Sequence, residues 1–313
     1  MNGKTMNFQP VLDEIVATLR PQIDRGCPGG TVASYIPALA RIDARQFGIA
    51  LRTCDGIEAG AGDFETPFSI QSVSKLFTLT LAMQRMGDAL WERIGREPSG
   101  NPFNSLVQLE NEQGKPRNPF INAGALVVAD VLVSHLRDPE RVVLDFMRAR
   151  GGNPQIGRDS AVDDRTRRDS HRNRALAHFI RSFGNLVNDV DRVLALYSFH
   201  CALRMDCVDL ARSVLFLADR GRCPSSDDPV TSAEFATRIN AVMLTCGTYD
   251  AAGEFAFYVG LPAKSGVGGG IVAVVPGLMS LCVWSPALDD KGNSLLGAYA
   301  LHRFTRMTGL SVF

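Results

Sequence analysis

The hydrophobic pattern of this chain changes twice, and this change constrains the fold more than any other feature. Alternating or continuous apolar stretches, typical of strands, lie near both ends, whereas the middle repeats apolar residues every three to four positions, as helices do. A strand buries its apolar face only within a sheet, so the strands of the two ends are expected to pair. The sequence therefore predicts an α+β fold, with an antiparallel sheet built from the two chain ends and a helical lobe between them.

Local signals place individual elements. Asp55-Gly56 is typical of a type I′ turn and predicts a hairpin between residues 47–52 and 57–61. Further strands are expected at 255–259, 270–275 and 278–284, and helices at 8–23, from Ser72 onward and at 293–307. We expect a single domain over residues 1–313, its sheet lobe formed by about 1–68 and 250–313 and its helical lobe by about 69–249.

Charge narrows the class of partner. Among the 313 residues, 33 Lys and Arg balance 33 Asp and Glu. A nucleic-acid-binding protein needs clustered basic side chains, so this neutral chain is expected to bind a small molecule and no nucleic acid. The run from Arg158 to Arg174 is rich in Arg but interleaved with Asp, which is typical of a solvated surface segment. For a neutral, apolar-rich chain we also expect a homo-oligomer, a dimer or a tetramer.

Other patterns bear on membranes, compartment and cofactors. The first residues carry no apolar leader pattern, and the apolar stretch Ile271 to Trp284 is broken by Pro276-Gly277, so neither a signal peptide nor a membrane span is expected. Seven cysteines without a CxxC pair favour free thiols in the cytoplasm. Five histidines lack the spacing of metal ligands, so we expect no metal and no other cofactor.

Ser72-Val-Ser-Lys75 is the first candidate for chemistry. Residues three apart on a helix share one face, so the hydroxyl and the amine can approach each other. A serine hydroxyl attacks only when a base takes its proton, and a lysine serves as that base when burial lowers its pKa. A helix N-terminus adds N–H donors for an oxyanion. The same spacing also arises by chance about once in a chain of this length.

A second candidate is the glycine-rich segment Lys264-Ser-Gly-Val-Gly-Gly-Gly270, just before an expected strand. Its glycines allow the backbone to approach a ligand closely, although a plain turn is an equal reading of the segment alone. SxxK with a later K-S-G is also the pattern of penicillin-recognising serine enzymes, whose third motif is matched only loosely by Ser99-Gly-Asn101.

With these segments in view, the chain resembles the bacterial glutaminase family over nearly its whole length. The resemblance is carried by long segments in the same order, which are Tyr35-Ile-Pro-Ala-Leu-Ala, Pro67-Phe-Ser-Ile-Gln-Ser-Val-Ser-Lys-Leu-Phe, Glu97-Pro-Ser-Gly-Asn-Pro-Phe-Asn-Ser, Gly114-Lys-Pro-Arg-Asn-Pro-Phe-Ile-Asn-Ala-Gly-Ala, Arg172-Asn-Arg-Ala-Leu-Ala, Leu244-Thr-Cys-Gly-Thr-Tyr-Asp, Lys264-Ser-Gly-Val-Gly-Gly-Gly, Ser285-Pro-Ala-Leu-Asp and Gly292-Asn-Ser. It implies a β-lactamase-like fold and cofactor-free hydrolysis of L-glutamine to L-glutamate and ammonia.

The resemblance also assigns roles to residues. It implies that Ser72 attacks the side-chain amide, that Lys75 takes the serine proton, and that Tyr249 or Tyr197 relays it to the departing ammonia. It implies an oxyanion hole formed by the N–H groups of Ser72 and Val267. Substrate-binding positions match Tyr35, Ser72, Asn122, Asn173, Tyr197, Tyr249 and Val267.

By local pattern alone, several of these residues have other interpretations. Tyr197 lies on an apolar helical stripe and is typical of a core residue. Asn122 precedes Ala-Gly-Ala and is typical of a helix cap. Asn173 lies within the charged run, and that pattern predicts a position at the surface. A solvent-facing side chain is also expected for Lys264, which is therefore left outside the catalytic set. A non-catalytic scaffold, in which Ser72 and Lys75 are structural, is therefore a competing hypothesis.

Two departures from the family pattern stand out. The family usually carries a Glu seven residues before the residue that matches Asn173, where it pairs with the substrate α-ammonium. This chain has Thr166 there, and Asp163, Asp164 or Asp169 are the nearest acidic substitutes. The sequence therefore also predicts a family member with altered or weakened substrate recognition. The second departure is a short insertion, Cys27-Pro-Gly-Gly-Thr31, interpreted either as a longer loop near the site or as a segment without functional role.

Overall fold

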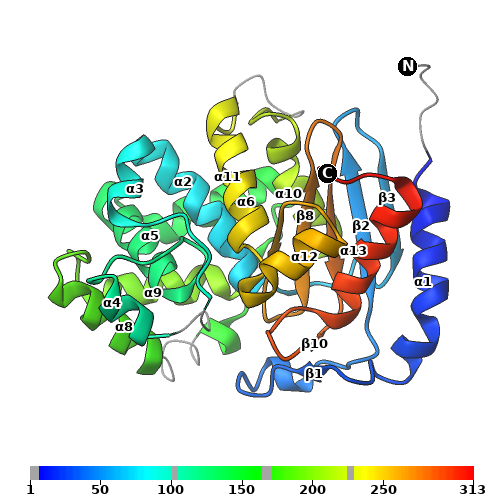
Figure 1. Cartoon of the computed structure of the whole chain (residues 1–313), viewed down its shortest axis with the longest axis horizontal. Helices are drawn as coiled ribbons and strands as arrows, with labels where there is room; N and C mark the ends of the chain where they lie inside the picture. Colours follow the sequence, from blue (N-terminus) through cyan, green and yellow to red (C-terminus); the bar gives the residue numbers. More distant parts are fainter. Residues whose placement is uncertain (1–6, 101–104, 164–170, 224–228) are drawn as a thin grey trace.

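A five-stranded antiparallel sheet joins the two ends of the chain. The computed structural model describes residues 7–100, 105–163, 171–223 and 229–313. The sheet order is β3-β2-β9-β8-β7, where the strands are β2 (Gly48–Thr53), β3 (Glu58–Gly62), β7 (Ala263–Ser265), β8 (Gly270–Val275) and β9 (Met279–Trp284). β2 pairs along its whole length with β9, from Gly48 opposite Trp284 to Thr53 opposite Met279. The predicted α+β fold, with its sheet built from both chain ends, is confirmed (Figure 1).

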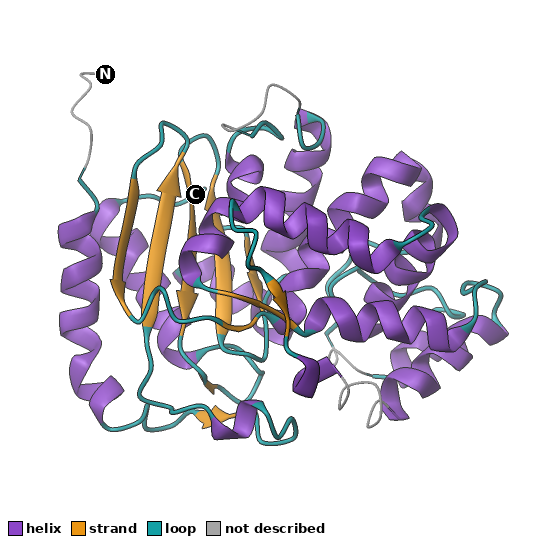
Figure 2. Cartoon of the chain, turned by 180° about the vertical axis from the view of Figure 1, so that it is seen from behind, coloured by secondary structure: helices purple, strands orange, loops and turns teal. Residues whose placement is uncertain are grey.

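Each face of this sheet packs against helices, because successive side chains of a strand point to opposite faces. Ile49, Ile271 and Leu281 share one apolar cluster with α1 (Gln9–Asp24) and α13 (Leu295–Thr308). Their neighbours Ala50 and Val272 belong to the other cluster, with the helical part of the chain. There α10 (Cys207–Ala218) packs directly on β2 and β9. Figure 2 shows the sheet between these two layers.

Most of the remaining helices lie on the α10 side of the sheet, whereas α12 (Ala252–Tyr258) packs in the cluster of α1 and α13. The central helix α2 (Lys75–Met86) is buried from Lys75 through Met83, between the sheet and the surrounding helices. The other helices are α3 (Leu90–Arg93), α4 (Val107–Asn111), α5 (Asn122–His135), α6 (Pro139–Gly151), α8 (His171–Ser182), α9 (Val190–Cys201) and α11 (Ala233–Cys246).

Short elements connect these parts. Two-stranded and three-stranded ladders are formed by β1 (Thr31–Val32) with β10 (Ala287–Leu288), and by β4 (Phe68–Ser69), β6 (Leu203–Met205) and β5 (Gly157–Arg158). The 3-10 turns are η1 (Leu39–Arg41), η2 (Gln71–Ser74), η3 (Gly87–Ala89) and η4 (Tyr249–Ala251).

Two local predictions are wrong. Residues 255–259 do not form a strand, because Phe255 and Val259 face the core one helical turn apart while Phe257 between them is 82% exposed. The hairpin of β2 and β3 forms as expected, but its turn is not type I′. The Thr53 N–H donates to the Ile57 carbonyl, and within this three-residue loop Gly56 alone has a positive φ, 101°.

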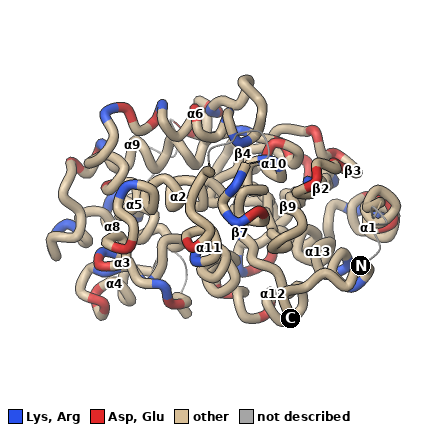
Figure 3. The backbone as a smooth tube through the Cα atoms, turned by 90° about the horizontal axis from the view of Figure 1, so that it is seen from above, with Lys and Arg blue, Asp and Glu red and all other residues tan. Residues whose placement is uncertain are grey.

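Charges are distributed over the whole molecule. Figure 3 shows acidic and basic residues interspersed along the helices and strands, in keeping with the zero net charge of the sequence. Within the described ranges, no helix combines the length and the apolar character needed to cross a bilayer.

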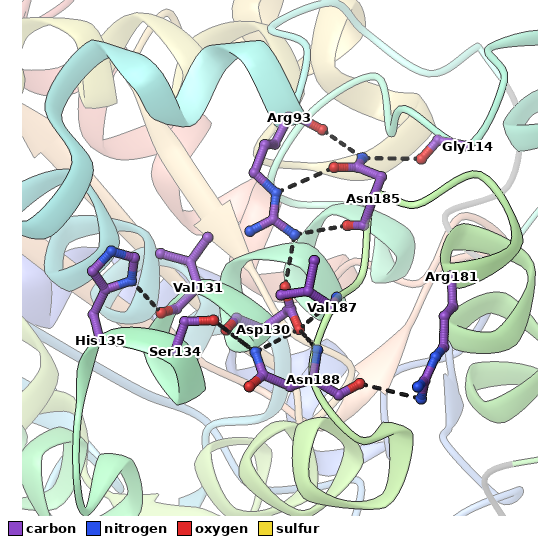
Figure 4. Close-up of polar contacts among 10 residues, drawn as sticks. All are labelled: Arg93, Gly114, Asp130, Val131, Ser134, His135, Arg181, Asn185, Val187 and Asn188. Atoms are coloured by element: carbon purple, nitrogen blue, oxygen red, sulfur yellow. Dashed lines mark hydrogen bonds and ion pairs between the residues drawn. The ribbon is translucent and has the colours of Figure 1, made fainter.

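A buried carboxylate connects three segments of the helical part (Figure 4). Asp130 on α5 is fully buried and accepts hydrogen bonds from the Arg93 guanidinium at 2.6 Å and from the backbone N–H groups of Val187 and Asn188 at 3.2 and 2.8 Å. The Asn188 side chain also donates to the Asp130 carboxylate, at 2.8 Å. Asp130 thereby fixes the segment that leads into α9, the helix that carries Tyr197.

This network predicts a large effect on stability. Asp130→Ala leaves the Arg93 guanidinium and two backbone N–H groups without their acceptor, so we expect it to lower the free energy of unfolding by about 3–5 kcal/mol. Urea denaturation of the purified variant measures the loss. Asp145→Ala on α6 is the matched control, because its ion pair with Arg141 is exposed and worth less than about 1 kcal/mol. Equal losses in the two variants would contradict the role assigned to Asp130.

Candidate functional site

Ser72 lies in the 3-10 turn η2, which runs directly into α2 at Lys75. The preceding residue, Gln71, has φ +47°, a left-handed conformation that costs a non-glycine residue about 1–3 kcal/mol. The Gln71 side chain is held by a 2.8 Å hydrogen bond to the Ser69 hydroxyl. The regular helix therefore begins three residues later than expected, and Ser72 stands on a strained turn at its start.

The glycine-rich segment from the far end of the chain packs on this turn. A Cβ atom on Gly266 would lie 2.6 Å from the Ile70 oxygen and 3.2 Å from the Ser72 nitrogen, and one on Gly268 would lie 2.1 Å from the Ser69 oxygen. Only glycine permits this approach. The backbone on both sides of Val267 thus lies against the backbone of the Ser72 turn, so the two segments that carry the predicted oxyanion donors are in contact.

Lys75 is buried at the centre of the site. Its Nζ donates to the Asn122 Oδ1 at 2.7 Å and to the Phe120 carbonyl at 3.1 Å, and it lies 5.7 Å from the centre of the Tyr197 ring. Burial lowers the pKa of Lys75 to about 8. A lysine with this pKa is partly neutral near physiological pH and can accept a proton.

Asn122 joins two predicted binding residues to Lys75. It is the first residue of α5, where its side chain makes no cap, so the helix-cap interpretation is wrong. While Oδ1 accepts from Lys75, Nδ2 donates to the Asn173 Oδ1 on α8 at 3.0 Å. The interpretation of Asn173 as plain solvated surface is therefore also wrong, since it contacts a buried side chain.

Three tyrosines complete the site. Tyr249, on η4 with φ +56°, is hydrogen-bonded to Ser72 and donates to the Ser265 carbonyl at 3.3 Å. Burial raises the pKa of both Tyr249 and Tyr197, and the nearby Tyr35 phenol raises both further. Tyr35 itself is 66% exposed, so it stands at the solvent side of the group while Tyr197 lies inside.

The sequence pattern predicted the wrong environment for Lys264. It is fully buried, not solvated, and its Nζ donates to the Gly247 and Ser265 carbonyls at 3.0 and 2.5 Å. The amine lies 4.6 Å from the centre of the Tyr249 ring. Burial, and then the Lys75 charge, lower its pKa well below the ordinary value. In the sequence, the K-S-G motif before an expected strand was the signal that could have predicted a buried position for Lys264.

The charged run departs from its predicted solvation at Asp163 as well. Asp163 is buried and accepts a hydrogen bond from the Arg158 guanidinium of β5 at 2.7 Å. Thr166 lies outside the described residues, as do Asp164, Asp169 and Asn101. The insertion at residues 27–31 leads from α1 into β1, where Thr31 pairs with Leu288, and the Cys27 side chain is buried.

In chemical terms, the site combines a serine hydroxyl hydrogen-bonded to a tyrosine phenol, a buried lysine three residues farther along that can accept a proton, and a glycine-rich loop packed on the serine turn. No group of three or more His, Cys, Asp or Glu side chains that suits a metal ion occurs in the described part of the chain. This is the combination of groups that a serine hydrolase acting on acyl compounds through a Ser–Lys pair requires.

Comparison with known proteins identifies the family to which the chain is similar. A family model described as Glutaminase matches residues 30–313. A glutaminase from Paraburkholderia phytofirmans is 53% identical over 308 residues, 98% of this chain and 100% of that protein. One from Streptomyces coelicolor is 55% identical over 306 residues, 98% of both. The structure of a probable glutaminase from Bacillus subtilis, complexed with 6-diazo-5-oxo-L-norleucine, matches with a TM-score of 0.87 at 32% identity, over 100% of this chain and 99% of that one.

The chain belongs to the glutaminase family of amidohydrolases. Its fold is β-lactamase-like, as the resemblance implied.

The pKa of Lys75 predicts how activity depends on pH. A lysine base must be neutral, so kcat/KM is expected to rise with pH and to level off above about pH 8. Asn122→Asp places a carboxylate on the Lys75 amine and stabilises its charged form, so the midpoint should move upward by at least about one pH unit. A pH profile of kcat/KM between pH 6 and 10 measures both. Asn240→Asp on α11 adds the same charge elsewhere and should leave the midpoint in place; an unmoved midpoint in Asn122→Asp would contradict the prediction.

Proposed function

We propose that this protein hydrolyses L-glutamine to L-glutamate and ammonia through a glutamyl ester on Ser72. The observation that carries the proposal is the Ser72 hydroxyl hydrogen-bonded to the Tyr249 phenol beside the glycine-rich loop, with the buried Lys75, its pKa lowered to about 8, three residues farther along the chain. Family membership favours this activity over a penicillin-recognising hydrolase and over a non-catalytic scaffold.

The chemistry proceeds in two halves. Neutral Lys75 takes the Ser72 proton while the oxygen attacks the side-chain amide carbon, and the oxyanion accepts hydrogen bonds from the N–H groups of Ser72 and Val267. The C–N bond then breaks as a proton reaches the nitrogen through Tyr249, or through Tyr197, and ammonia leaves. In the second half a water attacks the ester carbon while Lys75 takes its proton. The C–O bond to Ser72 then breaks, Lys75 returns the proton to the Ser72 oxygen, and L-glutamate is released.

The substrate is held by polar groups around this centre. We assign this role to Tyr35, Asn122, Asn173, Tyr197 and Tyr249. Asn122 and Asn173 are hydrogen-bonded to each other at 3.0 Å, which sets two amide groups at one side of the Lys75 amine. That a related probable glutaminase was crystallised with 6-diazo-5-oxo-L-norleucine supports an amino acid as the ligand.

The proposal extends to the domain organisation, the assembly and the compartment of the protein. We propose that residues 1–313 form a single catalytic domain, with a sheet lobe at about 1–68 and 250–313 and a helical lobe at about 69–249. The proposed protein is a cytoplasmic homo-oligomer, a dimer or a tetramer. None of the seven cysteines forms a disulfide bond, which supports a reducing compartment.

The direct test is release of ammonia from L-glutamine. Ser72→Ala removes the nucleophile and should lower kcat at least about a thousandfold, and Lys75→Ala, which removes the base, should do nearly the same. A coupled ammonia assay measures both. Ser182→Ala, which removes an exposed hydroxyl on α8, is the matched control and should keep full activity. Full activity in Ser72→Ala would refute the proposal.

Position 166 supports a second candidate, a family amidohydrolase with altered or weakened recognition of the α-ammonium. An ammonium that loses its carboxylate partner typically binds about a hundredfold more weakly. Thr166→Glu should then lower KM for L-glutamine at least tenfold, while Thr166→Gln, similar in size but uncharged, should not. Steady-state kinetics on L-glutamine and on glutaramate, which lacks the α-amino group, separate the cases. An unchanged or higher KM for L-glutamine in Thr166→Glu would exclude this candidate.

A further inference from the structure

A chain of buried hydrogen bonds lies behind the Ser72 turn, on the side of α9. His200, on α9, is fully buried, and its Nδ1 lies 2.7 Å from the hydroxyl of Ser74 in η2. The Ser74 hydroxyl in turn donates to the Gln71 carbonyl at 2.6 Å. The three groups thus connect a helix of the α-helical part to the peptide that precedes the nucleophile.

The hydrogen bonds determine which nitrogen of His200 carries the proton. A serine hydroxyl has a single hydrogen, and when Ser74 donates it to the Gln71 carbonyl at 2.6 Å, the 2.7 Å contact with His200 requires that Nδ1 donates to the Ser74 oxygen. Its Nε2 then has only a lone pair, and this atom is buried with no hydrogen-bond partner among the described residues. Burial, and then the Lys75 charge, lower the pKa of His200 to about 3, so the ring is neutral at working pH.

The last acceptor in this series of hydrogen bonds is the Gln71 carbonyl, which belongs to the peptide group that also carries the Ser72 N–H. The carbonyl of Gln71 and the N–H of Ser72 belong to one planar group and point in opposite directions. Whatever fixes the Gln71 oxygen therefore fixes the direction of the Ser72 N–H, which is a donor of the proposed oxyanion hole. Gln71 is strained at φ +47°, and a strained residue keeps its conformation only where neighbouring contacts hold it.

We propose that His200 is a positioning residue for the oxyanion hole, acting through Ser74 and the Gln71 carbonyl to hold the Ser72 N–H toward the substrate. The inference rests on the proposed function, because it assigns the Ser72 N–H its role there. A purely space-filling role for His200, which packs edge-on against Tyr197 with ring centres 5.3 Å apart, would require no bond to Ser74.

Kinetics of matched variants test the inference. His200→Leu keeps an apolar volume but removes the donor, and should lower kcat about tenfold with KM for L-glutamine changed less than about twofold, because an oxyanion hole acts on the transition state. His200→Asn places an amide N–H near the position of Nδ1–H and should recover kcat to within about threefold of wild type. Ser74→Ala should match His200→Leu, and the double variant should lose no more than either single variant.

Thr80→Val is the matched control. It removes a buried hydroxyl bonded to the Leu76 carbonyl of α2, away from the peptide at Gln71, and should keep the wild-type kcat. Wild-type kcat in His200→Leu, multiplied losses in the double variant, or no recovery in His200→Asn would each overturn the inference. Failure of the proposed function itself has a different signature, namely full activity in Ser72→Ala.

Nitrogen-15 NMR of histidine-labelled protein tests the same bond without any turnover. The His200 signals, identified by their loss in His200→Asn, should show the Nδ1–H tautomer from pH 6 to 9, and Ser74→Ala should shift the ring toward the Nε2–H form that free histidine prefers. An Nε2–H or doubly protonated ring in the wild type would overturn the inference. This measurement tests the hydrogen bond between His200 and Ser74 even if the His200→Leu variant fails to fold.

Discussion

The burial of Lys75 is the constraint on which the rest of the structure depends. An amine taken out of water strongly favours its neutral form, and this desolvation turns an ordinary lysine into a proton acceptor at moderate pH. Such burial requires protein on every side, so the helix that carries Lys75 runs through the middle of the molecule, between the sheet and the other helices. The Asn122 and Phe120 oxygens then satisfy the hydrogen bonds that water would otherwise make.

A second constraint follows from the first, because the nucleophile beside a buried base must itself be held against distant parts of the chain. Ser72 belongs to the early part of the sequence, and the loop around Val267 to the late part. They meet because β8 and β9 pair into the sheet next to β2, and because Gly266 and Gly268 leave no side chain in the way. Strand pairing in the antiparallel sheet thus brings the two halves of the site together.

Particular residues show why local sequence patterns predicted only part of this arrangement. Asn122 has the pattern of a helix cap, yet its amide joins Lys75 to Asn173 on α8, which lies 51 positions away. Lys264 has the pattern of an exposed lysine, yet aromatic rings and carbonyls surround it. Phe255 to Val259 alternates like a strand, but only Phe255 and Val259 face the core. In each case a contact from a distant segment outweighed the local preference, and such contacts leave no periodic trace in the sequence.

The sequence by itself determined the class of fold and most elements, and it named Ser72 and Lys75 as the candidate nucleophile and base, because hydrophobic period and motif spacing are local properties. Family resemblance added Tyr35, Asn173, Tyr197, Tyr249 and Val267 as candidates for the site. Only the tertiary structure decided that Lys75 and Lys264 are both buried, that Asn122 bonds the base, and that His200 reaches the nucleophile turn through Ser74. Burial and hydrogen bonding of this kind depend on which distant elements pack together, and that is a property of the whole fold.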